Sequence, residues 1–346
     1  MSTLEGRILV TGGAGFIGSA LVWALNQRGH RDIVLTDFLE PEKKWGGIVP
    51  VSAHREEKRR NLGPLKFAEY FEADDFRARL RAQPAAIGRF SCIFHLGACS
   101  STTETNADYL NDNNVAYTRE LAAWALAQKS RFIYASSAAT YGDGTAGMDD
   151  RDENLARLHP LNLYGQSKQD FDALAQREGW LGKIVGLKYF NVFGPNEDHK
   201  GDMRSLVNKA YQQIQAAGRV QLFKSHRPDF KDGEQQRDFL YVKDAVEMTL
   251  HFATTAKEAG GLFNLGSGEA NTWLTLTRAI FAALGRQPQI DFIPMPEVLR
   301  GKYQYFTQAD IAKLRATGYK REMTPLAEAV RDYVQAYLVP GKKLGA

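Results

Sequence analysis

The sequence predicts an α/β protein: a doubly wound parallel sheet with a smaller α/β domain toward the C-terminus. Short, almost continuously apolar runs alternate with helical patterns through the first half of the 346-residue chain. This pattern is typical of parallel strands that are covered on both faces. A glycine-rich turn joins the first of these runs to the first helix. After Gly194 the rhythm breaks into longer loops rich in glycine, proline and charge, which indicates the second domain.

Five apolar runs are the expected strands, and right-handed crossovers would make their sheet parallel. They cover residues 7–11, 32–37, 91–98, 131–137 and 183–192, with helices expected within 19–29 and 113–129. The charged segment from Lys43 to Pro64 is expected to be a loop-like surface excursion. We expect residues 1–193 and about 236–265 to form the nucleotide-binding domain. Residues 194–235 and 266–346 would then form a substrate-binding domain.

Composition excludes several classes of protein. The chain is 44% hydrophobic and 24% charged, without an apolar run that could span a bilayer, so no membrane partner is expected. The start runs almost directly into a strand, which leaves no room for a signal peptide. Cys92 and Cys99 match no metal or redox spacing, so we expect no metal and a reducing, cytoplasmic location. A net charge of +4 gives little reason to expect a nucleic-acid partner.

The run "VTGGAGFIGSA" follows the first strand and places Gly12, Gly15 and Gly18 three residues apart. A side chain at Gly12 or Gly15 would obstruct a tight turn or the approach of a pyrophosphate, and the helix N-terminus offers amides to that anion. Asp37 ends the second strand, where a carboxylate would accept a hydrogen bond from an adenosine ribose. A merely structural turn is the alternative, but the combination favours a Rossmann-type dinucleotide site.

The choice of dinucleotide stays open at this stage. Asp37 favours a cofactor without a 2′-phosphate, because the two negative charges would repel each other. Lys43 and Lys44 follow closely and could neutralise that phosphate.

The run "LNLYGQSK" places Tyr164 and Lys168 four residues apart, on one face of an expected helix. By itself this pair could be two ordinary solvated side chains. However, Ser136 and Ser137 end the fifth strand, and ligands in parallel sheets lie beyond the carboxyl ends of strands. Ser137, Tyr164 and Lys168 can therefore converge on a nicotinamide. The Lys168 ammonium and an oxidised nicotinamide would lower the pKa of the phenol, so that it can act as a base.

Longer runs support this interpretation. "TGGAGFIG", "YASSAATYG" and "YGQSK" resemble the extended short-chain dehydrogenase/reductase superfamily, whose members act on nucleotide sugars. "HLGACSSTTETNADYLNDNN", "KYFNVFGPNEDHKGDMRS" and "GKYQYFTQADIAKLRATGY" resemble, more particularly, its ADP-heptose 6-epimerase family. The resemblance extends from Arg7 to about Tyr337. It implies the C6 epimerisation of ADP-D-glycero-D-manno-heptose with tightly bound NADP, for lipopolysaccharide core synthesis, and a homo-oligomer, with a pentamer as the expected form.

The resemblance also implies roles for individual residues. Tyr164 would be one acid/base residue, with Ser137 assisting and Lys168 contacting the cofactor ribose. The other implied cofactor contacts lie in the glycine turn and after the next strands: Gly12, Gly15, Phe16, Ile17, Gly18, Asp37, Phe38, Lys44, Leu96, Gly97, Ala98, Cys99, Ser100, Asn113 and Val192. The implied substrate contacts, besides Ser137, are Asn191, Asp202, Lys209, Phe223, His226, Arg237 and Tyr303.

Lys200 matches a second acid/base residue that most of the superfamily lacks. Inversion by oxidation and re-reduction returns the hydride to the opposite face of the carbonyl. If the donor is fixed, the carbonyl must turn over, and its oxygen then points away from Tyr164 toward another proton donor. The alternative is a solvent-exposed lysine between charged neighbours.

Three rival functions remain possible for this sequence. A 4,6-dehydratase needs a carboxylate pair where this chain has Ala138 and Ala139, and a 4-epimerase does not need Lys200. A non-catalytic cofactor-binding protein commonly loses the tyrosine or the lysine, and both are present here. The chain departs from the family pattern at Leu96, where an acidic residue is usual. It also departs in the longer segments Trp45 to Leu65 and Ser225 to Phe239, which puts the rim of the substrate pocket in doubt.

Overall fold

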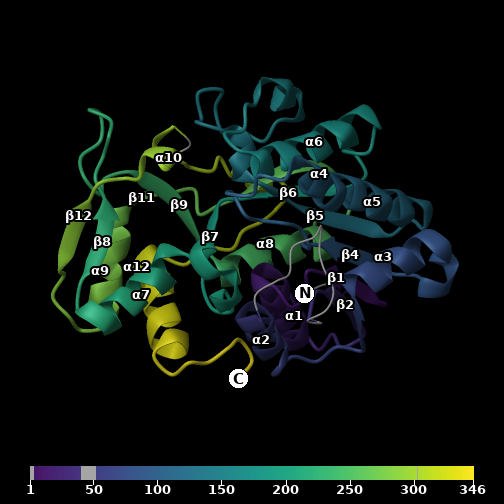
Figure 1. The fold of residues 1–346 in the computed structure, drawn as a ribbon. Coiled ribbons are helices and arrows are strands. Elements are labelled where there is room, and N and C mark those ends of the chain that lie inside the picture. Colours follow the sequence, from purple (N-terminus) through teal and green to yellow (C-terminus); the bar gives the residue numbers. More distant parts are fainter. Residues whose placement is uncertain (1–3, 40–51, 302) are drawn as a thin grey trace.

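The computed structural model describes residues 4–39, 52–301 and 303–346. Its centre is a parallel sheet of seven strands in the order β10-β6-β5-β4-β1-β2-β3 (Figure 1). The order reverses between β1 and β4, and ligands of open α/β sheets bind at such a switch point. The strands are β1 (Ile8–Thr11), β2 (Ile33–Asp37), β3 (Glu69–Glu72), β4 (Cys92–His95), β5 (Arg131–Ser137), β6 (Val185–Tyr189) and β10 (Gly261–Leu265).

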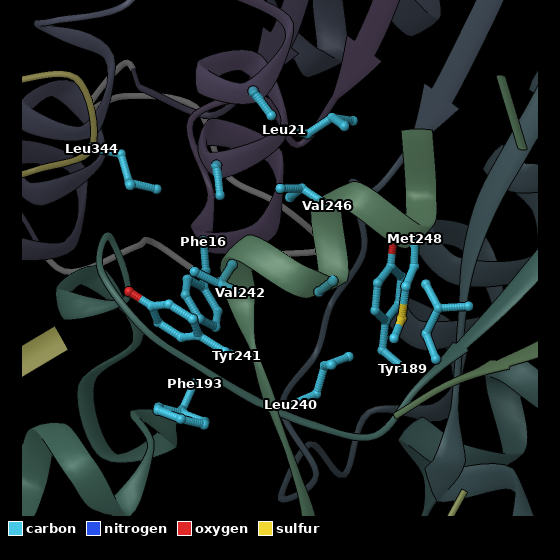
Figure 2. Packing of buried hydrophobic residues seen from close by; sticks show 14 of the residues in the cluster. Phe16, Leu21, Tyr189, Phe193, Leu240, Tyr241, Val242, Val246, Met248 and Leu344 are labelled. Atoms are coloured by element: carbon cyan, nitrogen blue, oxygen red, sulfur yellow. The ribbon is translucent and has the colours of Figure 1, made fainter. Parts of the chain in front are cut away.

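Helices cover both faces of this sheet, as the apolar strands predict. Along β1, Ile8 and Val10 belong to one buried cluster and Leu9 to another, because successive side chains of a strand point to opposite faces. The first face packs against α1 (Phe16–Gln27) and α8 (Val242–Thr254). Figure 2 shows Val242 and Val246 of α8 beside the helix that carries Phe16 and Leu21. The second face packs against α3 (Ala73–Ala82), α5 (Tyr117–Ala127) and α6 (Leu163–Arg177).

A second layer lies at one end of the sheet (Figure 1, left). It contains a parallel pair of strands, β8 (Val220–Phe223) and β12 (Ile290–Ile293), and the three-stranded sheet β11-β9-β7. The latter is formed by β7 (Asn191–Phe193), β9 (Gln236–Tyr241) and β11 (Ala270–Thr272). Its helices are α7 (Leu206–Ala217), α9 (Trp273–Ala283), α10 (Glu297–Arg300) and α12 (Leu326–Asp332). Helix α11 (Ala312–Ala316) instead packs against β10 of the central sheet. The division into two domains at the residues given above stays a prediction.

Short helices connect these elements. They are the 3₁₀-helices η1 (Pro84–Ile87), η3 (Ala138–Tyr141), η4 (Asp152–Arg157) and η5 (Asp198–Met203), the short α-helix α4 (Ala107–Leu110), and the π-helical turns η2 (Asn111–Ala116) and η6 (Tyr333–Leu338). Within the described ranges, no helix is both long and apolar enough to cross a membrane.

The parallel α/β fold is confirmed, and one of the predicted strands is corrected. The single strand expected over residues 183–192 is two strands. The amide of Phe190 donates to Leu265 O at 3.0 Å, and beyond this residue the chain leaves the central sheet. Asn191–Phe193 then pairs with β9 instead of β10. The nearly continuous apolar run over residues 183–192 does not reveal where the chain changes from one sheet to the other.

The prediction of a loop between Lys43 and Pro64 is wrong for the part that the structure describes. Residues Ser52–Leu62 form the helix α2. Much of α2 is polar and exposed, so its sequence lacks an apolar stripe. Asn61 and Leu62 are nevertheless buried, and α2 packs against η5 and α1. The segment is therefore part of the wall around the N-terminus of α1.

Candidate active site

The glycine turn after β1 has no room for side chains. Gly12 has φ +68°, and a Cβ there would lie 2.7 Å from Gly97 N, across the switch point between β1 and β4. A Cβ at Gly18 would lie 2.0 Å from Gly12 O. A Cβ at Gly15 would lie 3.1 Å from Gly12 O, and the next atoms near it would be Asp37 Oδ2 at 3.9 Å and His199 Nε2 at 4.0 Å. The turn and the first helix amides of Phe16 and Ile17 therefore form a cradle that fits a dinucleotide phosphate.

Asp37 is buried at the end of β2 and faces this cradle. Its carboxylate accepts hydrogen bonds from Ala14 N at 2.9 Å and Phe38 N at 2.8 Å. Lys58 of α2 donates to it at 2.7 Å. Burial would raise the pKa of Asp37, but the Lys58 charge and these hydrogen bonds hold that pKa below its usual value. Asp37 is therefore an ionised acceptor with a cation beside it.

Lys58 was not among the expected site residues. It occupies the place beside Asp37 that the sequence suggested for Lys44, and Lys44 lies outside the described residues. Lys58 lies in the charged run "HREEKRRNL", which contains several cationic residues. Because this helix has no apolar stripe, its sequence does not indicate which cation faces Asp37. The Lys58 side chain is 21% exposed, so it is only partly buried beside Asp37.

Three separate segments meet beside α1, and we call them together the cap: α2, the stretch from Asn196 to Met203 that includes η5, and Lys343 with Leu344. Asn61 of α2 donates to Ala14 O at 3.1 Å and to Asn196 O at 3.0 Å. The buried Lys343 ammonium pairs with Glu57 of α2 at 2.8 Å and with Asp198 of η5. These contacts fix the cap over the N-terminus of α1.

The loop after β4 carries the expected cofactor residues Leu96, Gly97, Ala98, Cys99 and Ser100. Two hydrogen bonds attach it to Asn114: Cys99 N donates to Asn114 Oδ1 at 2.9 Å, and Asn114 Nδ2 donates to Cys99 O at 3.0 Å. Asn114 also donates to Ser167 of α6 at 2.9 Å. This loop is thereby held against the helix that carries Tyr164 and Lys168.

Asn113 supports the assignment of a cofactor to this loop. It is 2% exposed, and its Oδ1 atom has no hydrogen-bond partner among the described residues. A buried amide oxygen is costly to leave unpaired, so a ligand donor is the expected partner. The glycine cradle and this unpaired atom both fit a dinucleotide.

The three residues expected to be catalytic come together in the structure. Ser137 ends β5, and its hydroxyl lies beside the Tyr164 phenol near the start of α6. Asn162 caps α6 by accepting from Gly165 N at 2.8 Å, which places Tyr164 in the first turn. The buried Lys168 ammonium donates to Ala135 O of β5 at 2.8 Å. The alternative of two ordinary solvated side chains is wrong, because Lys168 is buried.

The expected lowering of the phenol pKa needs the oxidised nicotinamide as well as Lys168, so it stays a prediction. In the chain alone, burial raises the pKa of Tyr164, and the Ser137 hydroxyl opposes this only in part. Burial lowers the pKa of Lys168 to about 8. The phenol is therefore protonated at neutral pH in this structure, and the sequence-based argument omitted the desolvation of both groups.

Lys200 is half-buried, so the alternative of a fully solvent-exposed lysine does not hold. Its ammonium lies 5.2 Å from the centre of the Phe16 ring, at the start of α1. Burial lowers the pKa of Lys200, while the Glu197 carboxylate raises it and Lys209 lowers it further. Within the described ranges, no hydrogen bond joins Lys200 to Tyr164 or Ser137. A lysine with a depressed pKa on the cofactor side of the cap can accept or donate a proton.

Arg237 of β9 forms the second part of the site. Its buried guanidinium lies 5.0 Å from the Tyr303 ring centre and 5.7 Å from that of Trp273, and Trp273 Nε1 donates to the Tyr303 hydroxyl at 2.8 Å. The Arg237 guanidinium also donates to the carbonyl oxygens of Gln236 and Gln304. In the part of the chain that the structure describes, it has no carboxylate partner. A buried cation without a counterion favours an anionic ligand.

The other expected substrate residues occupy two places. Asp202 and Lys209 lie beside Lys200, and Lys209 Nζ donates to Asp202 O at 3.2 Å. His226 is exposed, and its ring accepts a hydrogen bond from Met295 N at 3.3 Å. The ring therefore holds the segment around Met295. The remaining residues lie at strand ends: Asn191, which accepts from Thr307 at 3.3 Å, Val192, and the half-buried Phe223 of β8. Their assignment to substrate or cofactor stays a prediction.

Metal chemistry has no structural support in the described ranges, where no group of three or more His, Cys, Asp or Glu residues could hold an ion.

Comparisons with known proteins agree with this geometry. Residues 8–266 match the family described as "NAD dependent epimerase/dehydratase family". A protein of Nitratidesulfovibrio vulgaris named ADP-L-glycero-D-manno-heptose-6-epimerase is 47% identical over 330 residues, 95% of this chain and 97% of its own. A protein of the same name from Fusobacterium nucleatum is 43% identical, over 96% of this chain and 98% of its own.

Solved structures show the same fold. The crystal structure of the Helicobacter pylori ADP-L-glycero-D-manno-heptose-6-epimerase is 27% identical, with a TM-score of 0.77 over 96% of both chains. The Bacillus cereus UDP-glucuronic acid 4-epimerase, solved with UDP-glucuronic acid and NAD, is 24% identical, with a TM-score of 0.75 over 96% of this chain and all of its own. A nicotinamide cofactor is a property of this family, and the cradle and Asn113 fit one. The chain belongs to the NAD dependent epimerase/dehydratase family and, within it, to the ADP-L-glycero-D-manno-heptose-6-epimerases.

Proposed function

We propose that this protein inverts C6 of ADP-D-glycero-D-manno-heptose and forms ADP-L-glycero-D-manno-heptose. The single observation that carries the proposal is the pair of proton-transfer groups in two different places. Tyr164 lies with Ser137 at the sheet edge, and Lys200 lies in the cap beside Phe16. Relatives at 47% and 43% identity over nearly the whole chain carry the same name, which supports the substrate.

The proposed chemistry is a transient oxidation. When bound, a nicotinamide would supply the hydride acceptor and donor for C6. Ser137 and Tyr164 hold the substrate oxygen in one orientation and exchange its proton. Burial raises the pKa of Tyr164, so the phenol is protonated and can act as an acid. In the reverse direction, the Lys168 charge favours the phenolate, which can act as a base. Lys200 serves the opposite orientation, and burial, which lowers its pKa, favours the neutral amine that can act as a base.

NADP is the proposed form of the cofactor. Asp37 alone would repel a 2′-phosphate, but Lys58 forms an ion pair with Asp37 at 2.7 Å and neutralises its charge. His199 Nε2 is the other polar side-chain atom near Gly15, and burial lowers the pKa of His199 to about 3, so it is a neutral imidazole there. The ribose end therefore contains a cation and a neutral group that can donate a hydrogen bond, which together suit a phosphate.

Arg237 is the proposed anchor for the diphosphate of the sugar nucleotide. Its guanidinium is buried between the Tyr303 and Trp273 rings, without a carboxylate partner among the described residues. Bidentate donation to phosphate would supply the missing negative charge. The sugar would then extend from Arg237 toward the Ser137–Tyr164 pair.

The test is to incubate the purified protein with ADP-D-glycero-D-manno-heptose and to resolve the two C6 epimers by chromatography. We expect the L-glycero epimer to accumulate to an equilibrium mixture without added oxidant. Formation of a 4-epimer or a dehydrated sugar from another nucleotide sugar, with ADP-heptose left unchanged, would replace the proposal with one of its rivals.

A further inference from the structure

A fully buried polar network lies beneath the catalytic trio. Its centre is Asp172 of α6, which is one helical turn after Lys168 and 0% exposed. Its carboxylate accepts from the Tyr134 hydroxyl at 2.8 Å and from the Ser136 hydroxyl at 2.7 Å. The ammonium of Lys188, from β6, lies 3.3 Å from it.

The network reaches Ser137 through one residue. Lys188 is 1% exposed and donates to Thr140 Oγ1 at 2.6 Å. Thr140 in turn donates to Ser137 O at 2.8 Å. The Lys188 ammonium also lies 4.8 Å from the centre of the Tyr141 ring. The backbone of Ser137 is therefore held from below by a charged side chain that touches neither cofactor nor substrate.

Stability is a weak reason for such a pair. The desolvation of two buried charges cancels most of their attraction, and apolar residues of similar volume often do as well or better. The location suggests a reason connected with catalysis. The charged and titratable groups that face Lys168 are Asp172 on its own helix, the Cys99 thiol from the loop after β4, and His95 at the end of β4. Tyr164 shares its helix face one turn earlier. Asp172 is the one carboxylate in this set.

We propose that Asp172 and Lys188 are positioning residues, which hold Ser137 in place through Thr140 and keep Lys168 positively charged. The inference rests on the proposed function, because it assigns these residues to the same catalytic trio.

The charge on Lys168 can be followed by its pH dependence. Burial lowers the pKa of Lys168 to about 8, and Asp172 opposes this lowering. Activity that needs the ammonium is complete below this pKa and is lost as the pH rises through it. Removal of the Asp172 charge lowers the pKa of Lys168 further. The alkaline limb of the activity profile must then move to lower pH.

The experiment compares Asp172→Asn with Asp170→Asn. Asp170 lies on the same helix, is exposed, and accepts a hydrogen bond from Gln166. We expect the midpoint of the alkaline loss of epimerisation to fall by about one pH unit in Asp172→Asn, the usual scale for a nearby charge. The midpoint should not move in Asp170→Asn. Equal midpoints in all three proteins would overturn the proposal.

A double variant separates the charge effect from a loosened fold. Asp172→Asn alone leaves Lys188 buried without its partner and is expected to lower the melting temperature. Asp172→Asn with Lys188→Met removes both charges, so the melting temperature should recover in part. If the proposal holds, the midpoint stays low in the double variant, because Asp172 no longer acts on Lys168. A midpoint that returns to the wild-type value together with the melting temperature would show that the shift is merely structural.

A direct measurement keeps this test apart from the proposed reaction. NMR of protein labelled with ¹³C at lysine Cε reports the titration of Lys168, with its resonance assigned from its loss in Lys168→Met. We expect a lower pKa for Lys168 in Asp172→Asn than in wild type. If the wild-type protein does not epimerise ADP-heptose, the proposed function fails, but this titration still supports or overturns the effect of Asp172 on Lys168.

Discussion

The carboxyl ends of the central strands, which we call the sheet edge, and the cap contribute to the same site in different ways. At the sheet edge, Ser137 and Tyr164 lie at the end of β5 and the start of the helix that follows it, and both places are fixed by regular hydrogen-bonded structure. The cap is assembled from segments that are far apart in the chain. Lys343 joins Glu57 to Asp198 across 286 and 145 residues. The sheet edge therefore depends on the fold itself, whereas the cap depends on a few long-range ion pairs and hydrogen bonds.

This difference suggests a division of function. The sheet edge is common to the fold, and the Bacillus cereus 4-epimerase shares that fold with a TM-score of 0.75. Lys200, the second base in the proposed mechanism, belongs to the cap and lies beside Phe16. Our central claim is that each region supplies one proton-transfer group. The predictions below test each region, from the largest expected effect to the smallest.

The sheet edge is tested by Tyr164→Phe. The substitution removes one hydroxyl, so epimerisation should fall at least about a hundredfold, the usual scale for an acid/base residue. Folding and cofactor binding should be nearly unchanged, which a melting curve and a cofactor titration would check. Tyr211→Phe is a matched control on α7, and its activity should equal that of wild type. A Tyr164→Phe protein with normal turnover would contradict the assignment.

The ribose end of the cap is tested by Lys58→Met. Loss of the cation leaves Asp37 unpaired beside the expected 2′-phosphate, so the affinity for NADP should fall about tenfold, which corresponds to one charge-assisted hydrogen bond. The affinity for NAD should change much less. Fluorescence titration with both reduced cofactors would measure the ratio, with Lys66→Met as an exposed control. Equal losses for both cofactors would show that Lys58 does not distinguish them.

The assembly of the cap is tested by Lys343→Met. The variant leaves Glu57 and Asp198 without their shared cation. Both carboxylates are partly exposed, so we expect unfolding to become easier by only about 2 kcal/mol, less than for a fully buried pair. Epimerisation should slow severalfold, because η5 also carries Lys200. Lys342→Met is the matched control, since Lys342 is exposed and its neighbour carries the ion pairs. Identical melting and rates in the two variants would contradict the role of Lys343.

The same comparison explains what could be predicted from the sequence. The glycine turn, Asp37, Ser137, Tyr164 and Lys168 follow from local spacing, because strand ends and helix starts place them. The fold follows from apolar strands that the structure confirms. The phenol pKa could not be predicted from charges alone, because the burial of Tyr164 depends on the tertiary structure.

The cap could be predicted only in part. Lys200 came from a family resemblance, not from a physical pattern. Lys58 and His199 reach the site through tertiary contacts with Asp37 and Gly15. Helix α2 was missed because its exposed surface is so polar that no apolar stripe remains to reveal it. The residue pattern within one segment does not predict the contacts of the cap, because those contacts join three segments that are far apart in the sequence.

The most direct test of the two-base claim measures overall epimerisation and one half-reaction, the dismutation of an aldehyde analogue, in Tyr164→Phe and Lys200→Met. Lys183→Met, which alters an exposed lysine, is the control for the loss of a charge. Epimerisation passes through both carbonyl orientations, so we expect both variants to slow it strongly. The half-reaction uses one orientation, so one variant should impair it far more than the other. Wild-type epimerisation by Lys200→Met would contradict the claim and would leave Tyr164 to act on both faces.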